Sequence, residues 1–360
     1  MSSPRIWLLT GAKQGDNAQA ERLIAASGLP FERRRIVLKP GYDLAKPRIE
    51  ASLHHVDLEK SDPLAPPWPD LVLTIGRRMA MVALWIKAQS QDRARLALIG
   101  TPKGDSGKID LFIVPFQYRA GEAPNIFRIG LPLLGIDPAR IATEGERWRE
   151  VFAPLPRPLT VLLCGGSIGS HSFDPETARS VLATIDRMKD GGSLQITTSR
   201  RTPPETVAAM ERALPAGAKL YRWDKADGAN PYLGLLAHGD RFVVTGDSIS
   251  MLVEVARLGK PLAIAPLRLA SRTVSQTLRQ LHLPDELAYW TAAKAQAIHN
   301  RLLGDDTSRD FALLHDLMIE KGWAVPLGRP FSPPKEPPAD DTALAAARLR
   351  ALVAPPRATP

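Results

Sequence analysis

The fold is decided by the stretch from Phe242 to Pro266, which reads FVVTGDSISMLVEVARLGKPLAIAP. It opens with an apolar, β-branched run that is typical of a buried strand, and residues 262–264 have the same character. Between these runs, apolar residues recur at helical spacing, Asp247 or Ser248 can cap the first turn, and Gly259 ends the helix. The stretch therefore predicts a βαβ unit, and ligands of open α/β sheets bind at the edge where such a helix begins.

Glu254 is the only carboxylate on this predicted helix. It lies about a turn and a half from the helix start, where its side chain can reach toward a ligand held at that start. Asp247, Ser248 and Ser250 add polar groups at the same place. A charge on a solvated helix face is the alternative explanation of Glu254, and the pattern leaves both open.

Composition narrows the class of protein. The chain has 360 residues, enough for two domains. Lys and Arg outnumber Asp and Glu by 47 to 38, giving a net charge of +9. This charge favours an anionic substrate or contact with a membrane surface. The chain has no basic run interleaved with aromatic residues, so we expect no nucleic-acid partner.

The expected cellular compartment is inferred from three features that the sequence lacks. The single cysteine, Cys164, excludes an intrachain disulfide framework. No apolar run approaches the roughly twenty residues of a membrane span. The first residues have no signal-peptide layout. We therefore expect a cytoplasmic protein, with peripheral contact at the inner face of the membrane as an option.

The first half predicts an α/β domain over residues 1–152. Ile6–Thr10 has the composition of a buried strand. A glycine-bearing loop follows at residues 11–17, and a helix is predicted from residue 18 to residue 26. A loop between the first strand and the first helix is the usual ligand cradle of doubly wound folds.

Two groups of polar residues lie at predicted strand ends of this half. In the first loop, Lys13 and Gly15 are candidates for a phosphate or acceptor contact. Asp16 is either the N-cap of the helix or an acid that faces a ligand, and one carboxylate can do both. Arg77 and Arg78 follow another predicted strand and start a helix, where paired arginines can hold an anion.

The second half repeats this arrangement. Three prolines in Ala153–Pro158 predict a stiff linker and a domain boundary, so the second domain is expected over residues 159–326. Its first strand, Leu159–Cys164, precedes a glycine-rich loop at residues 165–170. Residues 327–341 form a proline-rich linker, and a last helix is predicted over residues 342–354.

Glycines in a loop of this kind let backbone N–H groups approach a phosphate. A plain tight turn is the alternative explanation. Arg200 and Arg201 follow a further predicted strand and bring cations to the same edge. The residues expected to bind phosphate here are Gly165, Gly166, Ser167, Gly169, Arg200 and Arg201.

Three motifs carry a resemblance to a known family: Gly246–Met251 with Glu254 and the Gly-Lys-Pro that follows, Gly76-Arg-Arg, and Ser199-Arg-Arg-Thr. They resemble motifs of the mitochondrial-fission (elongated mitochondria) family, whose pattern looks like the nucleotide-sugar motif of glycosyltransferase-B-fold enzymes. The resemblance covers nearly the whole chain and implies an α/β protein of two Rossmann-like domains facing across a cleft. The chain departs from the family pattern at Phe116-Gln-Tyr, where an acidic or histidine pair is usual.

The resemblance also implies roles for individual residues. Glu254 would accept hydrogen bonds from the ribose of a nucleotide, and the loop that begins at Gly165 would contact the diphosphate. Asp16 would serve as the catalytic base on the acceptor side. The last helix would cross back to pack on the N-terminal domain, and a membrane-anchoring helix is the alternative.

These expectations predict a glycosyltransferase that moves a sugar from a nucleotide-diphosphate donor to an acceptor, which can be lipid-linked. No metal and no cofactor are expected, since the sequence has no spaced Asp-x-Asp pair and preorganised donors can stabilise a leaving diphosphate. Two alternatives remain. One is a nucleotide-sugar epimerase on the same fold, and the other is a non-catalytic interaction protein of the fission family.

Overall fold

The structure is a computed structural model, and it describes residues 3–42, 49–101, 106–118, 120–135, 137–167, 171–188, 190–223, 230–269 and 311–354. These residues form two compact units. Unit 1 contains those up to Leu134 and from Ala339 onward, and unit 2 contains those from Gly135 to Pro338. Each unit is built on a six-stranded sheet, and all strand pairs in these sheets are parallel. The predicted class of two Rossmann-like α/β domains is therefore confirmed.

The sheet of unit 1 has the strand order β2-β1-β3-β4-β5-β6. The chain builds on one side of β1 first and then on the other, so the order reverses between β1 and β3. Ligand sites of open α/β sheets lie at such a reversal, outside the carboxyl ends of the strands. The elements of unit 1 are β1 (Ile6–Thr10), α1 (Gln14–Ser27), β2 (Glu32–Arg35), β3 (Leu71–Ile75), α2 (Arg77–Gln89), β4 (Arg95–Ile99), the 3-10 helix η1 (Ser106–Lys108), β5 (Leu111–Pro115), β6 (Ile126–Ile129) and α12 (Thr342–Val353).

Successive residues of β1 face opposite sides of this sheet, as strand geometry requires. Ile6 and Leu8 belong to a core shared with α1 and α12, whereas Trp7 and Leu9 belong to a second core shared with α2. Both faces are covered, which explains why the inner strands β1, β3 and β5 are nearly continuous apolar runs.

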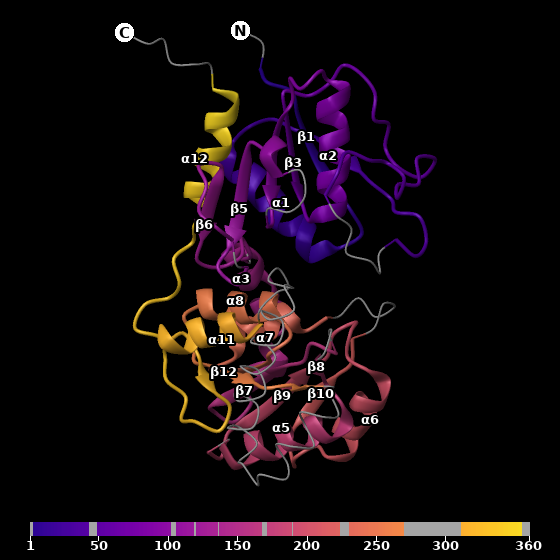
Figure 1. Cartoon of the computed structure of the whole chain (residues 1–360). Helices are drawn as coiled ribbons and strands as arrows, with labels where there is room; N and C mark the ends of the chain where they lie inside the picture. The colour runs from indigo at the N-terminus through magenta and orange to yellow at the C-terminus, as the bar shows by residue number, and fades with distance from the viewer. Residues whose placement is uncertain are drawn as a thin grey trace. The chain divides into compact units, whose positions relative to one another are not determined.

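The last helix, α12, packs on unit 1. It contacts α1, β4 and β5, and Figure 1 shows it in yellow beside the other elements of unit 1. Asp341 accepts a hydrogen bond from the backbone N–H of Gly130 at 2.8 Å. Arg350 donates to the carbonyl of Ser27 at 3.3 Å, at the C-terminal end of α1 where orphan carbonyls favour a cation.

The sheet of unit 2 has the strand order β10-β9-β7-β11-β12-β14. Counted from its own first strand this is the order 3-2-1-4-5-6 of a Rossmann fold, and the reversal lies between β7 and β11. The elements of unit 2 are α3 (Pro138–Arg147), α4 (Arg149–Phe152), β7 (Leu159–Leu163), β8 (His171–Ser172), α5 (Pro175–Met188), β9 (Ser193–Thr197), α6 (Pro204–Arg212), β10 (Lys219–Tyr221), α7 (Tyr232–His238), β11 (Arg241–Thr245), α8 (Ile249–Arg257), β12 (Leu262–Ala265), β13 (Arg268–Leu269), α11 (Phe311–Glu320) and β14 (Val325–Pro326).

The boundary between the units lies before α3, whereas the sequence analysis places it in the proline-rich stretch after residue 152. Helices α3 and α4 belong to unit 2 because they pack on α7. A Cβ added at Gly234 would lie 2.5 Å from the Trp148 ring, so only glycine permits this approach. His238 also donates a hydrogen bond to the carbonyl of Gly145 at 2.8 Å.

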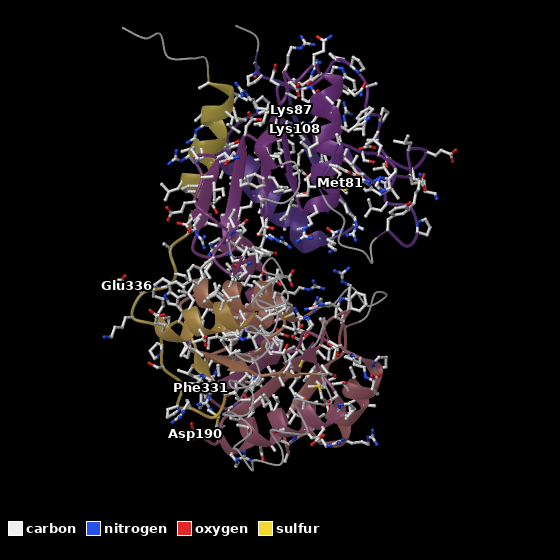
Figure 2. All side chains as sticks on the ribbon, viewed as in Figure 1. Met81, Lys87, Lys108, Asp190, Phe331 and Glu336 are labelled. Carbon is white, nitrogen blue, oxygen red and sulfur yellow. The ribbon has the colours of Figure 1, made fainter. Side chains whose placement is uncertain are left out.

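The proline-rich segment before α12 is held on unit 2. Arg241 lies 4.9 Å from the ring centre of Phe331 and 3.1 Å from a carboxylate oxygen of Asp190. Figure 2 shows Phe331 and Asp190 at the same end of unit 2. Leu327 donates its N–H to the carbonyl of Ile264 at 3.0 Å. None of the helices in the described part of the chain is long and apolar enough to span a membrane.

Candidate functional site

Three loops meet at the carboxyl edge of the sheet in unit 2. They follow β7, β9 and β11, which are neighbours in the sheet with β7 in the middle. The predicted phosphate residues therefore lie on adjacent loops, and the first and third loops flank the reversal in strand order. This is the place in the fold where a ligand is expected.

Asp247 joins the three loops. Its carboxylate accepts hydrogen bonds from the N–H of Gly166 at 2.8 Å and from the hydroxyl of Thr245 at 2.7 Å. It also forms an ion pair with Arg201 at 2.8 Å. The side chain of Asp247 has no exposed surface. Burial raises the pKa of this carboxyl, and the Arg201 guanidinium with the Gly166 N–H opposes that rise.

The glycines of the first loop are required by this contact. A Cβ added at Gly165 would overlap the Asp247 carboxylate, and one added at Gly166 would overlap the carbonyl of Arg201. The N–H of Gly165 donates to the Thr245 hydroxyl at 2.7 Å, and that of Gly166 donates to Asp247. Protein oxygens therefore accept from both N–H groups, and neither is an unpaired donor for the predicted diphosphate contact.

The second loop is held in the same way. The carbonyl of Gly165 accepts hydrogen bonds from the hydroxyls of Ser199 at 2.8 Å and Thr202 at 2.5 Å. Arg201 is 42% exposed and paired with Asp247, whereas the neighbouring Arg200 is exposed and has no ion pair among the described residues. The two arginines predicted to act together thus have different surroundings.

Two further residues of the first loop were predicted to contact phosphate. The hydroxyl of Ser167 accepts a hydrogen bond from the N–H of Phe173 at 3.1 Å, which gives it a place in the loop. Gly169 lies outside the described residues.

Helix α8 begins with backbone donors that lack an acceptor. Ser248 is its N-cap and makes no side-chain capping bond, although the sequence predicts a cap at Asp247 or Ser248. The N–H groups of Ile249, Ser250 and Met251 have no acceptor in the part of the chain that the structure describes. Orphan N–H groups and the helix dipole together favour an anion at such a helix start.

Glu254 lies on the same helix and is half-buried. Its carboxylate accepts a hydrogen bond from the hydroxyl of Tyr232, the first residue of α7. Among the described residues the Glu254 carboxylate has no other hydrogen-bond donor. Burial raises the pKa of Glu254 from 4.5 to about 7, and the Tyr232 hydrogen bond opposes the rise. Glu254 is therefore a desolvated acceptor with unused capacity.

In unit 1, α1 begins at Gln14 and so includes residues 14–17, which were predicted to lie in the loop. Gly15 and Asp16 are in its first turn, and Lys13 is the N-cap without a side-chain capping bond. The interpretation of Asp16 as the N-cap is therefore wrong. An acidic side chain in the first turn is favoured by the helix dipole, which explains the earlier start.

The loop after β1 is fixed by Asn17, which the sequence analysis did not identify. Its side chain accepts from the N–H of Gly11 at 3.0 Å and donates to the carbonyl of the same residue at 2.7 Å. Arg77 and Arg78 begin α2 after β3, on the other side of the strand reversal of unit 1. His55 donates to the carbonyl of Arg78 at 2.9 Å and so holds the start of that helix.

The described residues contain no group of three or more His, Cys, Asp or Glu side chains placed to hold a metal ion. The structure adds Asn17 and Thr245 to the residues of the site. It also shows that Ser199 and Thr202, the ends of the Ser-Arg-Arg-Thr motif, donate to the Gly165 carbonyl, and that Tyr232 is the partner of Glu254. Apart from that of Asn17, these contacts join segments that are distant in the sequence, and no local motif indicates which residues pair.

Fold and site together define an α/β protein of two parallel-sheet domains, each with polar residues at its strand reversal. A family model described as mitochondrial fission ELM1 matches residues 14–307. The chain therefore belongs to the mitochondrial fission ELM1 family, and the resemblance stated above is confirmed. The mitochondrial fission protein ELM1 of Arabidopsis thaliana is 27% identical over 219 residues, which is 54% of this chain. The match spans about half of the Arabidopsis protein, 51% of its length.

Similar solved structures share less sequence identity with the chain than the Arabidopsis relative does. The UDP-GlcNAc 2-epimerase of Neisseria meningitidis bound to UDP-GlcNAc is 10% identical with a TM-score of 0.49, covering 96% of this chain and 98% of that one. A glycosyltransferase of Rickettsia africae ESF-5 is 12% identical with a TM-score of 0.43, covering 90% and 99% of the two chains. The two Rossmann-like sheets are assigned from the strand orders of this chain and not from these similarities.

The raised pKa of Glu254 predicts a pH-dependent effect of Glu254→Gln. Between pH 4.5 and about 7 the folded state binds a proton at Glu254 that the unfolded state has lost, so stability falls as pH rises through this window. Gln stays neutral and still accepts from Tyr232. The variant should match wild type near pH 5 and exceed its free energy of unfolding by on the order of 1–3 kcal/mol at pH 8.

Thermal unfolding of both proteins at the two pH values measures this difference. Glu336→Gln, at an exposed position of the proline-rich segment (labelled in Figure 2), is the matched control and should not change the pH profile. Equal differences between Glu254→Gln and wild type at pH 5 and pH 8 would contradict a desolvated Glu254.

Proposed function

We propose that unit 2 binds the nucleotide of a nucleotide-diphosphate sugar, and that the protein transfers the sugar to an acceptor without a metal ion. The observation that carries this proposal is the pairing of two features on α8, the orphan N–H groups at its start and the half-buried Glu254. One binds an anion, and the other accepts hydrogen bonds from hydroxyl groups.

The spacing of these features fits a nucleotide. Ile249 and Glu254 are five positions apart, about 7.5 Å along the helix axis. Helical side chains lean toward the N-terminus, which shortens the gap between the Glu254 carboxylate and the helix start. A diphosphate at the helix start thus leaves a ribose within reach of Glu254.

Charge on the second loop supports the same assignment. Arg200 follows β9, which is two strands from β11, roughly 10 Å across the sheet. An exposed arginine at that distance can reach a diphosphate at the start of α8. Together with the helix N–H groups it would stabilise the charge that grows on the leaving diphosphate.

The acceptor would bind to unit 1. Asp16 lies in the first turn of α1, at the strand reversal of that sheet, and would accept the proton of the attacking hydroxyl. Lys13, Arg77 and Arg78 border the same reversal. The net charge of +9 favours an anionic acceptor or one held at an anionic membrane surface.

A second candidate function is nucleotide binding without turnover. It is favoured by family membership, because the Arabidopsis relative bears the name of a fission protein. The two candidates share the site on α8 and differ only in whether a bound donor is consumed.

The binding claim is tested by a thermal-shift screen of ADP, CDP, GDP and UDP. A nucleotide at about a hundred times its Kd should stabilise wild type by roughly 2.7 kcal/mol. Arg200→Ala should unfold at the wild-type temperature without ligand and show a smaller shift with it. Arg201→Ala is the matched comparison, and it should be less stable without ligand because Asp247 loses its counter-charge.

If no nucleotide changes the unfolding temperature of wild type, the proposal fails. Equal loss of stability in the two arginine variants would show that the Arg201–Asp247 pair does not hold the loop.

The transfer claim is tested with Asp16→Asn. Release of nucleoside diphosphate from a bound donor should fall by about 100-fold or more, while the Kd of the nucleotide stays unchanged. Glu21→Gln, on the same helix and paired with Arg33, is the control and should leave both values at the wild-type level. A wild-type protein that binds nucleotide but consumes no nucleotide sugar would favour the non-catalytic candidate.

A further inference from the structure

Tyr232 and Glu254 form a pair that joins two helices. The hydroxyl of Tyr232 donates to Oε2 of Glu254, and the two residues lie on either side of β11 in the sequence. Tyr232 is at the first position of α7, which precedes β11 and therefore has its start at the carboxyl edge of the sheet. Glu254 is on α8, which follows β11. The pair thus lies at the edge where the proposed nucleotide binds.

Several contacts fix the start of α7, where Tyr232 lies. The backbone N–H of this tyrosine donates to the side chain of Asn230 at 3.0 Å, and the carbonyl of Pro231 accepts from Leu235 at 2.8 Å. Two residues further along α7, Gly234 packs directly on Trp148. Burial and the Glu254 carboxylate raise the pKa of Tyr232 well above its ordinary value, so its hydroxyl stays a donor at neutral pH.

The hydrogen bond leaves Glu254 with defined acceptors. An ionised carboxylate offers about four lone-pair sites. The Tyr232 hydroxyl uses one of them and fixes the rotation of the carboxylate. The remaining sites include all those of Oε1, for which the described residues provide no donor.

We infer that Tyr232 is a positioning residue that presents Glu254 to the 2′- and 3′-hydroxyls of a ribose, which makes the site selective for ribonucleotides over 2′-deoxyribonucleotides. The inference rests on the proposed function, which already puts a ribose within reach of Glu254, and adds the residue that positions the carboxylate. A vicinal diol supplies two donors to a carboxylate that has been removed from water. A 2′-deoxyribose supplies one, and a desolvated acceptor left without a donor opposes binding.

The test compares dissociation constants of ADP, CDP, GDP and UDP with those of their 2′-deoxy counterparts by calorimetry. Wild type should bind the preferred ribonucleotide about tenfold more tightly than its 2′-deoxy form. In Tyr232→Phe the ribonucleotide should lose about tenfold in affinity and the 2′-deoxy form should lose much less, so the ratio approaches one. A general structural defect would weaken both ligands equally.

Tyr221→Phe is the matched control. Tyr221 is a half-buried tyrosine of the same unit, and its hydroxyl has no hydrogen-bond partner in the described structure. Its removal should leave both affinities unchanged. Glu254→Gln should also bring the ratio of ribonucleotide to 2′-deoxyribonucleotide affinity toward one. Adding Tyr232→Phe to Glu254→Gln should cause no further loss of affinity, since the two residues act as one unit.

The outcomes separate the two proposals. Wild type that binds no nucleotide overturns the proposed function and with it this inference. If wild type binds nucleotide and Tyr232→Phe keeps the wild-type ratio of ribonucleotide to 2′-deoxyribonucleotide affinity, only the inference about Tyr232 is overturned.

Discussion

A carboxylate with no exposed surface fixes the loops of unit 2. Asp247 lies in the loop after β11 and contacts the hydroxyl of Thr245 at the end of that strand. It also contacts the N–H of Gly166 in the loop after β7 and the guanidinium of Arg201 in the loop after β9. An unpaired charge in this place would be costly, and each partner reduces the cost only in its present position. The loops are therefore coupled, because moving one removes a partner from the carboxylate.

This constraint has a consequence for the start of α8. Asp247 immediately precedes the N-cap of the helix, so anchoring Asp247 also anchors the helix start. The network takes up the N–H groups of Gly165 and Gly166 and leaves those of Ile249, Ser250 and Met251 without a described acceptor. The N–H groups that remain without an acceptor favour an anionic ligand at the start of α8. Gly165 and Gly166 are needed for the packing of the loop.

Glu254 shows the energetic cost of such a site. Its desolvation opposes the charged form, and Tyr232 offsets only part of that opposition. Half-buried carboxylates with unused acceptors lower stability, so their presence at a strand reversal is better explained by a ligand than by folding. Asp110 in unit 1 is a useful contrast. Its carboxylate is paired with both Lys87 and Arg95 at 2.8 Å, and it therefore needs no ligand.

The sequence predicts the two α/β domains because buried parallel strands and their helices leave strong local patterns. The βαβ unit from Phe242 to Pro266 is present as β11, α8 and β12. The domain boundary is different from the prediction, because α3 and α4 are assigned by contacts with α7 that are distant in sequence.

The site is less predictable than the fold for the same reason. Gly166 and Asp247 are 81 residues apart, and nothing near either residue indicates the contact. The two adjacent arginines at 200 and 201 look equivalent in the sequence, yet only one has a buried partner. Glu254 could be identified because it is the only acid on an apolar helix. Tyr232 could not be assigned to it, because their contact depends on how α7 and α8 pack.

The most direct test of the central claim is a crystal structure of the protein with the nucleoside diphosphate that it binds most tightly. We expect the diphosphate at the N–H groups of Ile249, Ser250 and Met251, and the ribose hydroxyls within hydrogen-bonding distance of the Glu254 carboxylate. A nucleotide bound elsewhere, or one whose ribose does not contact Glu254, would contradict the account.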